Sequence, residues 1–357
     1  ARALGERIGD PRVLALAQFA AAHIPLLFGD WAEAQARLRE AERLLSERCR
    51  GVHWETSLAR AWLCTVLIFL GRLGEARRDA FELLHEASER GDRFARTHVI
   101  YAACVAYIVD DEAAVARRVV DELFRDAPPD RYTSAHWGAL VSNVSLDRYE
   151  GDGPGAWRRM SEAWPALRRS LLLRVQMVRV FAHFERALCA LAAADAAGDE
   201  AEAAPLVRSA EADARRLARE DVPYARAMGR YALAAVLAAR GQGPAALAAL
   251  RAAVDECEAA KLGYFAACAR DRYGELLGAA GAAERGASRV YFAQEGVRAP
   301  ERCLAMSAPG YRRLLEGGGR LAAPPARGLL PSGVRPSGLA GGAPAAASVP
   351  PSTEGPG

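Results

Sequence analysis

Histidine and cysteine, the residue types that most often bind metals or attack substrates, are scattered along this sequence. The six histidines are His23, His53, His85, His98, His136 and His183, and the seven cysteines are Cys49, Cys64, Cys104, Cys189, Cys257, Cys268 and Cys303. A zinc site needs such residues in close pairs, and neither Cys-x-x-Cys nor His-x-x-x-His occurs. The sequence therefore predicts no metal site, and the dispersed cysteines favour a reducing, cytoplasmic compartment.

Signatures of nucleotide chemistry and of nucleophilic catalysis are also missing. A P-loop ends in Gly-Lys-Ser/Thr, but the only lysine, Lys261, stands between alanine and leucine. The kinase motifs are lacking except for an isolated Ala299-Pro300-Glu301, and no Gly-x-Ser-x-Gly elbow is present. We therefore predict no catalytic residue, no cofactor and no enzymatic activity for this chain.

The composition favours stacked helices with a solvated surface. Hydrophobic residues make up 51% of the 357 residues, but aromatic residues make up only 7%, so the core must be rich in Ala and Leu. The 47 basic and 44 acidic residues are interspersed and leave a net charge of +3, which predicts neither nucleic-acid nor membrane binding. The longest apolar stretch, 13–28, is shorter than the ~20 residues of a spanning helix.

A turn signal recurs at intervals of 39 to 47 residues and divides the chain into repeats. It stands at Gly29-Asp30, Gly71-Arg72, Asp110-Asp111, Gly151-Asp152, Gly198-Asp199, Gly241-Gln242 and Gly281-Ala282. Glycine at such a turn ends one helix in the left-handed conformation, and aspartate caps the next. The signal predicts about seven antiparallel helical hairpins.

Small residues at fixed positions after the turn support this interpretation. Alanine stands five residues past it at Ala34, Ala76, Ala156, Ala203 and Ala246, and twelve past it at Ala41, Ala163, Ala210 and Ala253. The two helices of a hairpin cross closely at such points. The pattern resembles the tetratricopeptide (TPR) repeat, although the period near 42 exceeds the usual ~34 residues.

The fold predicted from these repeats is an all-α superhelical array of TPR-like hairpins over residues 1–316. Residues 317–357 are rich in Gly, Pro and Ala and almost free of charge, so we expect a disordered tail. Arrays of this kind bind a protein or peptide partner on the concave face formed by their first helices. The candidate residues for that face are Tyr101, Tyr224, Arg226, Arg230, Tyr231, Arg270 and Tyr273.

A more specific motif stands near the end of the repeats. Its members are Gly296, Val297, Arg298, Pro300, Arg302, Met306, Pro309 and Gly310. It resembles the ending of large myxobacterial-type serine/threonine kinases that carry a STAND-type ATPase module and a TPR-like region. The resemblance implies that this chain, which begins without Met, is the C-terminal sensor or scaffold part of such a bacterial protein, with the kinase and ATPase upstream.

Three alternatives remain open. The array can be the repeat domain of a large ATP-dependent transcription regulator, but nothing after Gly310 has the pattern of a helix-turn-helix. It can also be a stand-alone TPR adaptor. An enzyme with an unrecognised site is the least favoured, because every common catalytic signature is missing.

Overall fold

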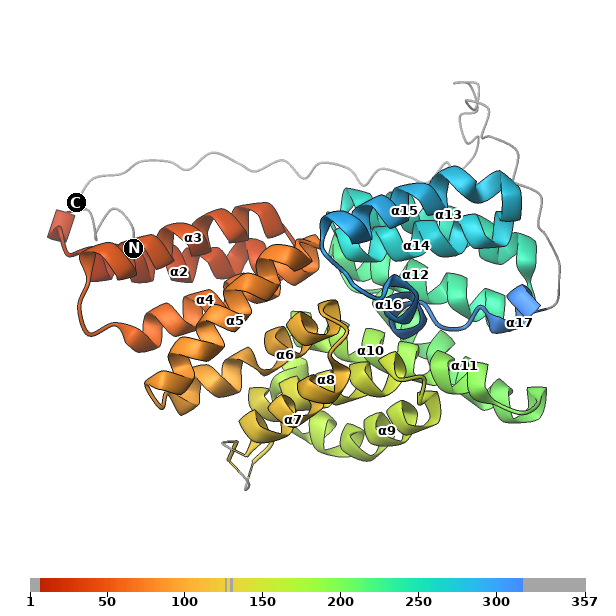
Figure 1. The fold of residues 1–357 in the computed structure, drawn as a ribbon, viewed down its shortest axis with the longest axis horizontal. Coiled ribbons are helices and arrows are strands. Elements are labelled where there is room, and N and C mark those ends of the chain that lie inside the picture. Colours follow the sequence, from red (N-terminus) through yellow and green to blue (C-terminus); the bar gives the residue numbers. More distant parts are fainter. Residues whose placement is uncertain (1–6, 126, 129–130, 317–357) are drawn as a thin grey trace, which may run out of the picture. The chain divides into compact units, whose positions relative to one another are not determined.

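A computed structural model describes residues 7–125, 127–128 and 131–316, and within these residues the regular structure is entirely helical (Figure 1). The first helices of the hairpins are α2 (Pro11–Phe28), α4 (His53–Leu70), α6 (Arg93–Val109), α8 (Ser134–Tyr149), α10 (Gln176–Ala196), α12 (Pro223–Ala239) and α14 (Gly263–Leu277). The second helices are α3 (Trp31–Arg48), α5 (Leu73–Glu89), α7 (Ala113–Phe124), α9 (Gly153–Arg169), α11 (Glu200–Leu217), α13 (Gly243–Ala259) and α15 (Ala282–Gln294). The predicted all-α hairpin array is confirmed, while the predicted tail, 317–357, lies outside the described residues.

The turns between paired helices form at the predicted places. Gly29, Gly71, Gly151 and Gly241 have φ between 71° and 84°, in the left-handed region that glycine adopts without strain. In the third hairpin Asp111 takes this conformation with φ 57°. The last hairpin differs, since Gly278 has the positive φ and a short 3₁₀ helix (Gly278–Gly281) makes the connection.

The alanines after the turns lie where the paired helices cross. Of those five residues past a turn, Ala34, Ala76, Ala156 and Ala246 are buried, and Ala203 is half-buried. Of those twelve past it, Ala41, Ala210 and Ala253 are buried, and Ala163 is half-buried. A larger side chain at the buried positions would separate the helices, which explains the period of small residues.

The seventh hairpin packs against the second, which the sequence did not predict. The start of α14 meets the end of α4, where a Cβ on Gly263 would lie 2.6 Å from the carbonyl oxygen of Leu70. Tyr291 on α15 donates a hydrogen bond of 2.5 Å to the carbonyl oxygen of Gly71, and the Gly74 amide donates to Glu295 at 2.9 Å. We call this contact the seam.

The first hairpin joins the same junction through aromatic rings. Trp31 is fully buried and stacks on Phe69 of α4 with ring centroids 4.5 Å apart. The ring of Tyr224, at the start of α12, meets the Trp31 ring edge-on at 5.2 Å, and its hydroxyl donates to the Leu27 carbonyl at 3.4 Å. The early and late hairpins thus share one hydrophobic core.

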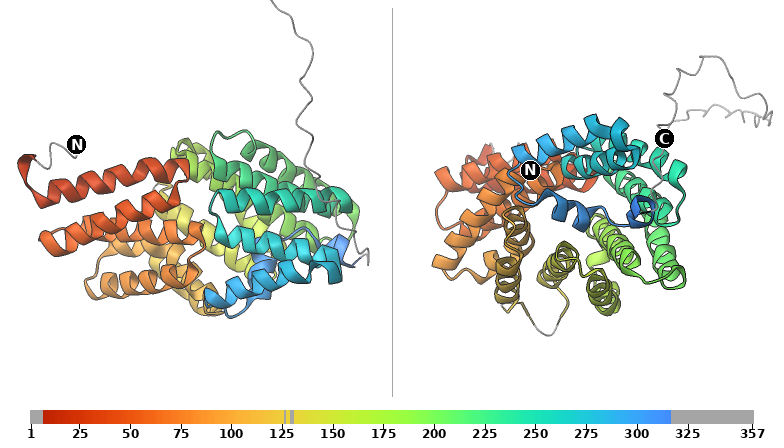
Figure 2. Two further views of the ribbon diagram at one scale, coloured as in Figure 1. Left: turned by 90° about the horizontal axis from the view of Figure 1, so that it is seen from above. Right: turned by 45° about the vertical axis from the view of Figure 1, so that its right-hand side comes forward.

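The last helices do not form another hairpin. Helix α16 (Pro300–Ser307) packs on α8 and α14, and the short α17 (Arg312–Glu316) packs on α12 and α14. In Figure 2 the dark-blue α16 lies within the curve formed by the surrounding helices. We call the side of the first helices that α16 contacts the inner face.

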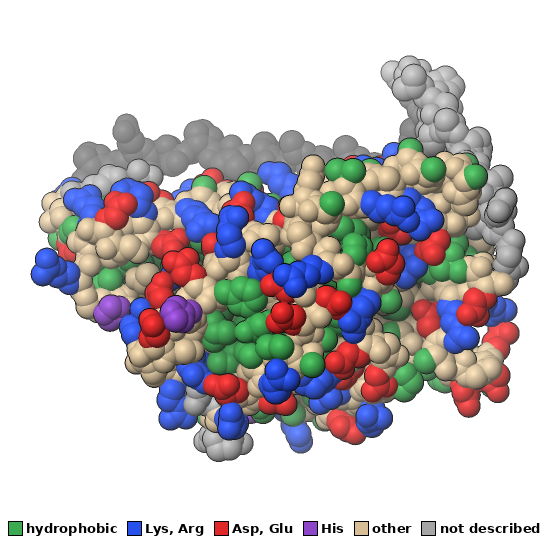
Figure 3. Space-filling view, in the orientation of Figure 1, with side chains coloured by type: hydrophobic (Ala, Val, Ile, Leu, Met, Phe, Trp, Pro, Cys, Tyr) green, Lys and Arg blue, Asp and Glu red, His purple; other side chains and the backbone are tan. Residues whose placement is uncertain are grey.

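The surface of the array carries interspersed charges of both signs, as the composition predicts (Figure 3). Among the described helices, α2 alone is long and apolar enough to cross a membrane by length and hydropathy. In the array it forms the first hairpin with α3, and its Ile24 and Phe28 side chains are 65% and 63% exposed.

We expect Gly263→Ala to weaken the seam. The new methyl group would push α14 away from α4, and overpacking of this kind costs roughly 1–3 kcal/mol. Urea unfolding followed by circular dichroism measures the change in the free energy of unfolding. Gly286→Ala on α15 is the matched control, because a Cβ there meets no atom within 4 Å. The control should stabilise the helix by up to about 1 kcal/mol; equal effects at both glycines would contradict the packing at the seam.

Candidate functional site

The residues that follow α15 lie on the inner face and are held there mainly through their backbone. Tyr231 of α12 donates a hydrogen bond of 2.9 Å to the carbonyl oxygen of Ser307. The hydroxyls of Tyr264 and Ser307 lie 2.7 Å apart. Arg272 of α14 donates from Nε to the Ala308 carbonyl at 3.0 Å. Tyr231 and Arg272 thus hold this stretch by backbone carbonyl groups, which are common to every peptide. We call residues 296–311 the C-terminal segment.

The beginning of the C-terminal segment is attached to the turn of the third hairpin. The Arg298 amide donates to the Val109 carbonyl at 3.0 Å. Arg302 donates to the carboxylate of Asp111 at 2.5 Å, and its guanidinium lies 4.2 Å from the centre of the Tyr149 ring. Arginine suits position 302 because its guanidinium forms an ion pair with Asp111 and a cation–π contact with Tyr149 at the same time.

The end of the C-terminal segment is anchored on Asp195, in the last turn of α10. The Gly310 amide donates to its carboxylate at 2.5 Å, and Arg312 donates to its carbonyl oxygen at 2.7 Å. Burial raises the pKa of the Asp195 carboxyl, against the effect of these hydrogen bonds. Gly310 has φ 96°, and a Cβ there would lie 3.1 Å from the Ala235 carbonyl oxygen, so glycine alone fits without strain.

The inner face beneath α16 contains a buried ion pair. Arg148 of α8 donates to Glu185 of α10 at 2.6 Å, and the two side chains are 2% and 6% exposed. Burial tends to lower the pKa of Arg148, but the Glu185 carboxylate reverses this and raises it. The pair lines a cavity of about 50 Å³ that is closed by Cys303, Met306 and Ser307 of the C-terminal segment.

A second, larger cavity of about 170 Å³ lies between the starts of the inner helices. Five aromatic side chains from four helices line it: Trp62 and Phe69 of α4, Tyr101 of α6, Trp137 of α8 and Phe181 of α10. Phe181 meets the rings of Phe69, Tyr101 and Trp137 edge-on, at centroid distances of 5.6, 5.8 and 6.3 Å. We call this space the aromatic cavity; Phe69, Tyr101 and Phe181 line the 50 Å³ cavity as well.

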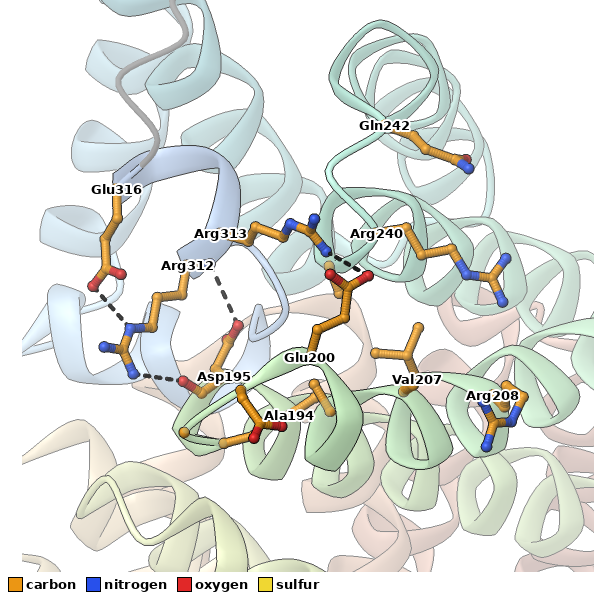
Figure 4. A pocket seen from close by; sticks show the side chains of 16 residues that line it. Ala194, Asp195, Glu200, Val207, Arg208, Arg240, Gln242, Arg312, Arg313 and Glu316 are labelled. Atoms are coloured by element: carbon orange, nitrogen blue, oxygen red, sulfur yellow. Dashed lines mark hydrogen bonds and ion pairs between the residues drawn. The ribbon is translucent and has the colours of Figure 1, made fainter.

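A wide polar cleft of about 810 Å³ separates the fifth and sixth hairpins next to α17 (Figure 4). Its charged side chains largely pair with one another. Arg313 lies 3.3 Å from Glu200, Arg312 pairs with Glu316 at 2.8 Å, and Arg240 pairs with the nearby Glu211 at 2.5 Å. The pairing leaves the cleft without an excess of one charge to select a charged ligand.

The predicted tyrosines lie within or against the core. Tyr231 contacts the C-terminal segment and Tyr101 lines the aromatic cavity, so both lie on the inner face. Tyr224 is buried at the junction with the first hairpin, and Tyr273 is buried in α14. Burial raises the pKa of Tyr101, Tyr224 and Tyr231.

Two of the predicted arginines, Arg230 and Arg270, pair with residues on the second helices of the hairpins. Arg230 pairs with Glu256 of α13 at 3.2 Å, and Arg270 pairs with Glu258 of α13 and Glu284 of α15. Arg226 and Arg230 line a surface groove between α11, α12 and α13. Arg230 and Arg270 point toward the second helices, where the carboxylates of Glu256, Glu258 and Glu284 are available.

Sequence reasoning missed the residues that hold the C-terminal segment. Tyr264, Arg272 and Asp195 come from different hairpins, and no spacing along the chain connects them. The motif at 296–310 was the available signal, because its glycines, prolines and arginines are the residues that shape this segment.

The described residues contain no group of three or more His, Cys, Asp or Glu side chains that could hold a metal ion. Six cysteines are buried, and burial raises the pKa of the Cys64, Cys104 and Cys189 thiols to about 12. These thiols are therefore protonated at neutral pH and poor nucleophiles.

The Arg148–Glu185 pair gives a test of the inner face. Arg148→Met should lower the free energy of unfolding by roughly 3–5 kcal/mol, because it leaves the Glu185 carboxylate buried without a partner. The double variant Arg148→Met/Glu185→Leu removes both charges and should lose much less. Denaturant unfolding of both single variants and the double variant gives the coupling energy; additive losses would show that the pair is solvated and not buried together.

Comparison of the chain with models of protein families, with curated proteins and with solved structures finds no match.

Proposed function

We propose that this chain is a protein-interaction and regulatory module that binds a partner segment on its inner face. The observation that supports this function is the C-terminal segment itself. Its backbone accepts hydrogen bonds from Tyr231 and Arg272 and donates one to Asp195, while its Cys303 and Leu304 side chains are buried. A face that holds one peptide in this way is suited to hold another.

The module belongs, in this proposal, to a cytoplasmic bacterial serine/threonine kinase–ATPase signalling protein. The support is the motif from Gly296 to Gly310, which resembles the ending of such proteins. Its arginines and glycines take part in seating the C-terminal segment, as Arg302 on Asp111 and Gly310 on Asp195 illustrate. The upstream kinase and ATPase domains are then partners within the same polypeptide, and the array itself performs no catalysis.

Addition of the C-terminal segment as a separate peptide tests the binding face. The variant Arg302→Ala/Gly310→Ala loses the ion pair to Asp111 and places a methyl group against Ala235, so its own segment should leave the inner face. A fluorescent peptide of residues 296–316 should then bind this variant at least about tenfold more tightly than the unaltered chain, where the tethered segment competes at high effective concentration. Fluorescence anisotropy measures the two dissociation constants.

Two controls make this experiment decisive. Gly286→Ala changes an exposed glycine of α15 and should bind the peptide no better than the unaltered chain. Circular dichroism should show the helices of the array retained in all three proteins, with at most the small loss from the eight-residue α16 in the double variant. Equal peptide binding by the double variant and the unaltered chain, or no binding by either, would contradict a peptide-binding inner face.

The gene tests the second part of the proposal. The coding sequence upstream of Ala1 should encode a kinase domain with its catalytic His-Arg-Asp and Asp-Phe-Gly motifs, followed by a P-loop. An upstream sequence without these motifs would contradict the assignment to a kinase–ATPase protein and leave the peptide-binding prediction unaffected.

A further inference from the structure

The aromatic cavity differs from the rest of the inner face because none of the described residues in its lining is a Lys, Arg, Asp or Glu. Its walls consist of aromatic and aliphatic side chains, with Thr65, Thr97, His98, Tyr101 and Ser134 as the polar residues. Burial of an ion in such a space is costly, because no opposite charge is present to compensate for lost hydration. The lining therefore selects a neutral ligand.

The size of the cavity suits a ligand with one small ring. A protein cavity of about 150 Å³ lined by apolar side chains binds benzene, and the aromatic cavity measures about 170 Å³. The ring faces and edges of Trp62, Trp137 and Phe181 surround this space and offer the offset and edge-on contacts that a further ring prefers.

Unused hydrogen-bonding groups in the lining indicate that the ligand also carries a polar atom. The hydroxyl of Tyr101, which lies in the lining, makes no hydrogen bond within the described part of the chain. Nδ1 of His98 is engaged with the Phe94 carbonyl at 2.9 Å, which leaves its Nε2 available. Ligand sites typically combine an apolar lining with a few such groups, which fix the orientation of the ligand.

We propose that the aromatic cavity binds a small neutral molecule that consists of one aromatic ring with a hydroxyl or N–H group. A free compound suits it better than a peptide side chain. The C-terminal segment is held elsewhere on the inner face by Arg272 and Asp195, which engage backbone groups, whereas the described lining of the aromatic cavity offers no Arg, Asp or Glu for this purpose. The ligand is independent of the partner segment proposed above, since the two occupy different parts of the inner face.

Gly138 provides a way to close the cavity without damage to the fold. It lies in α8 on the cavity wall, and a Cβ there would meet only the Ile100 Cβ, at 3.9 Å. In the variant Gly138→Leu, the leucine side chain should therefore occupy the space in which the ligand ring would bind. The matched control is Gly286→Leu, which makes the same change in the exposed part of α15.

The test is calorimetric titration of the full chain with phenol, and with benzoate as a charged compound of the same ring size. Phenol should bind the unaltered chain and Gly286→Leu equally, should bind Gly138→Leu at least about tenfold more weakly, and should be preferred over benzoate by about tenfold or more. Thermal unfolding gives a second readout, because phenol should raise the Tm of the unaltered chain and of Gly286→Leu but not that of Gly138→Leu.

Four results would overturn the inference. These are no phenol binding to the unaltered chain, equal binding to Gly138→Leu, equal binding of benzoate, or tighter binding of N-acetyltyrosinamide than of phenol. N-acetyltyrosinamide carries the same ring on a peptide backbone. Tighter binding of this compound would therefore identify a protein side chain as the occupant of the cavity. None of these results changes the outcome of the peptide titration described above. Failure of the ligand proposal can therefore be distinguished from failure of the proposed peptide binding.

Discussion

The close approach of two helix ends at the seam is the constraint on which the rest of the structure depends. Gly263 and Gly71 lie where the backbone of α14 meets that of α4, and neither has space for a side chain. This contact holds the late hairpins against the early ones. The C-terminal segment contacts early and late hairpins together. Tyr264 and Arg272 belong to α14, while Asp111 and Asp195 belong to earlier hairpins. Its binding surface therefore exists only in the closed array.

Local rules were sufficient to predict the hairpins from the sequence, but not the closure of the array. Glycine and aspartate at the turns, and alanine at the crossings, act within one hairpin, so their spacing appears directly in the sequence. The seam joins residues that are 220 positions apart, as in the bond from Tyr291 to Gly71, and such pairs leave no periodic trace. Gly71 was recognised as a turn residue, while its second role at the seam was not visible.

The candidate site was predictable only in part, for a similar reason. Tyr101 and Tyr231 lie on the inner face, because large apolar side chains on first helices point toward the core. Arg230 is a candidate for the same face, but its neighbour Tyr231 points inward and consecutive helical residues point in different directions. The ion pair to Glu256 depends on the position of another helix, which the sequence pattern does not encode.

Closure also changes how the protein folds. In an open array each repeat contacts only its neighbours, so stability is a sum of local contributions and folding can begin anywhere and spread. Here the last hairpin must return to the second, and contacts between distant residues slow the search for the native state. The hairpins are expected to form early and the seam late. Until it closes, the rings of Trp31 and Phe69 lack Tyr224 as a neighbour, which makes this intermediate the species most exposed to aggregation.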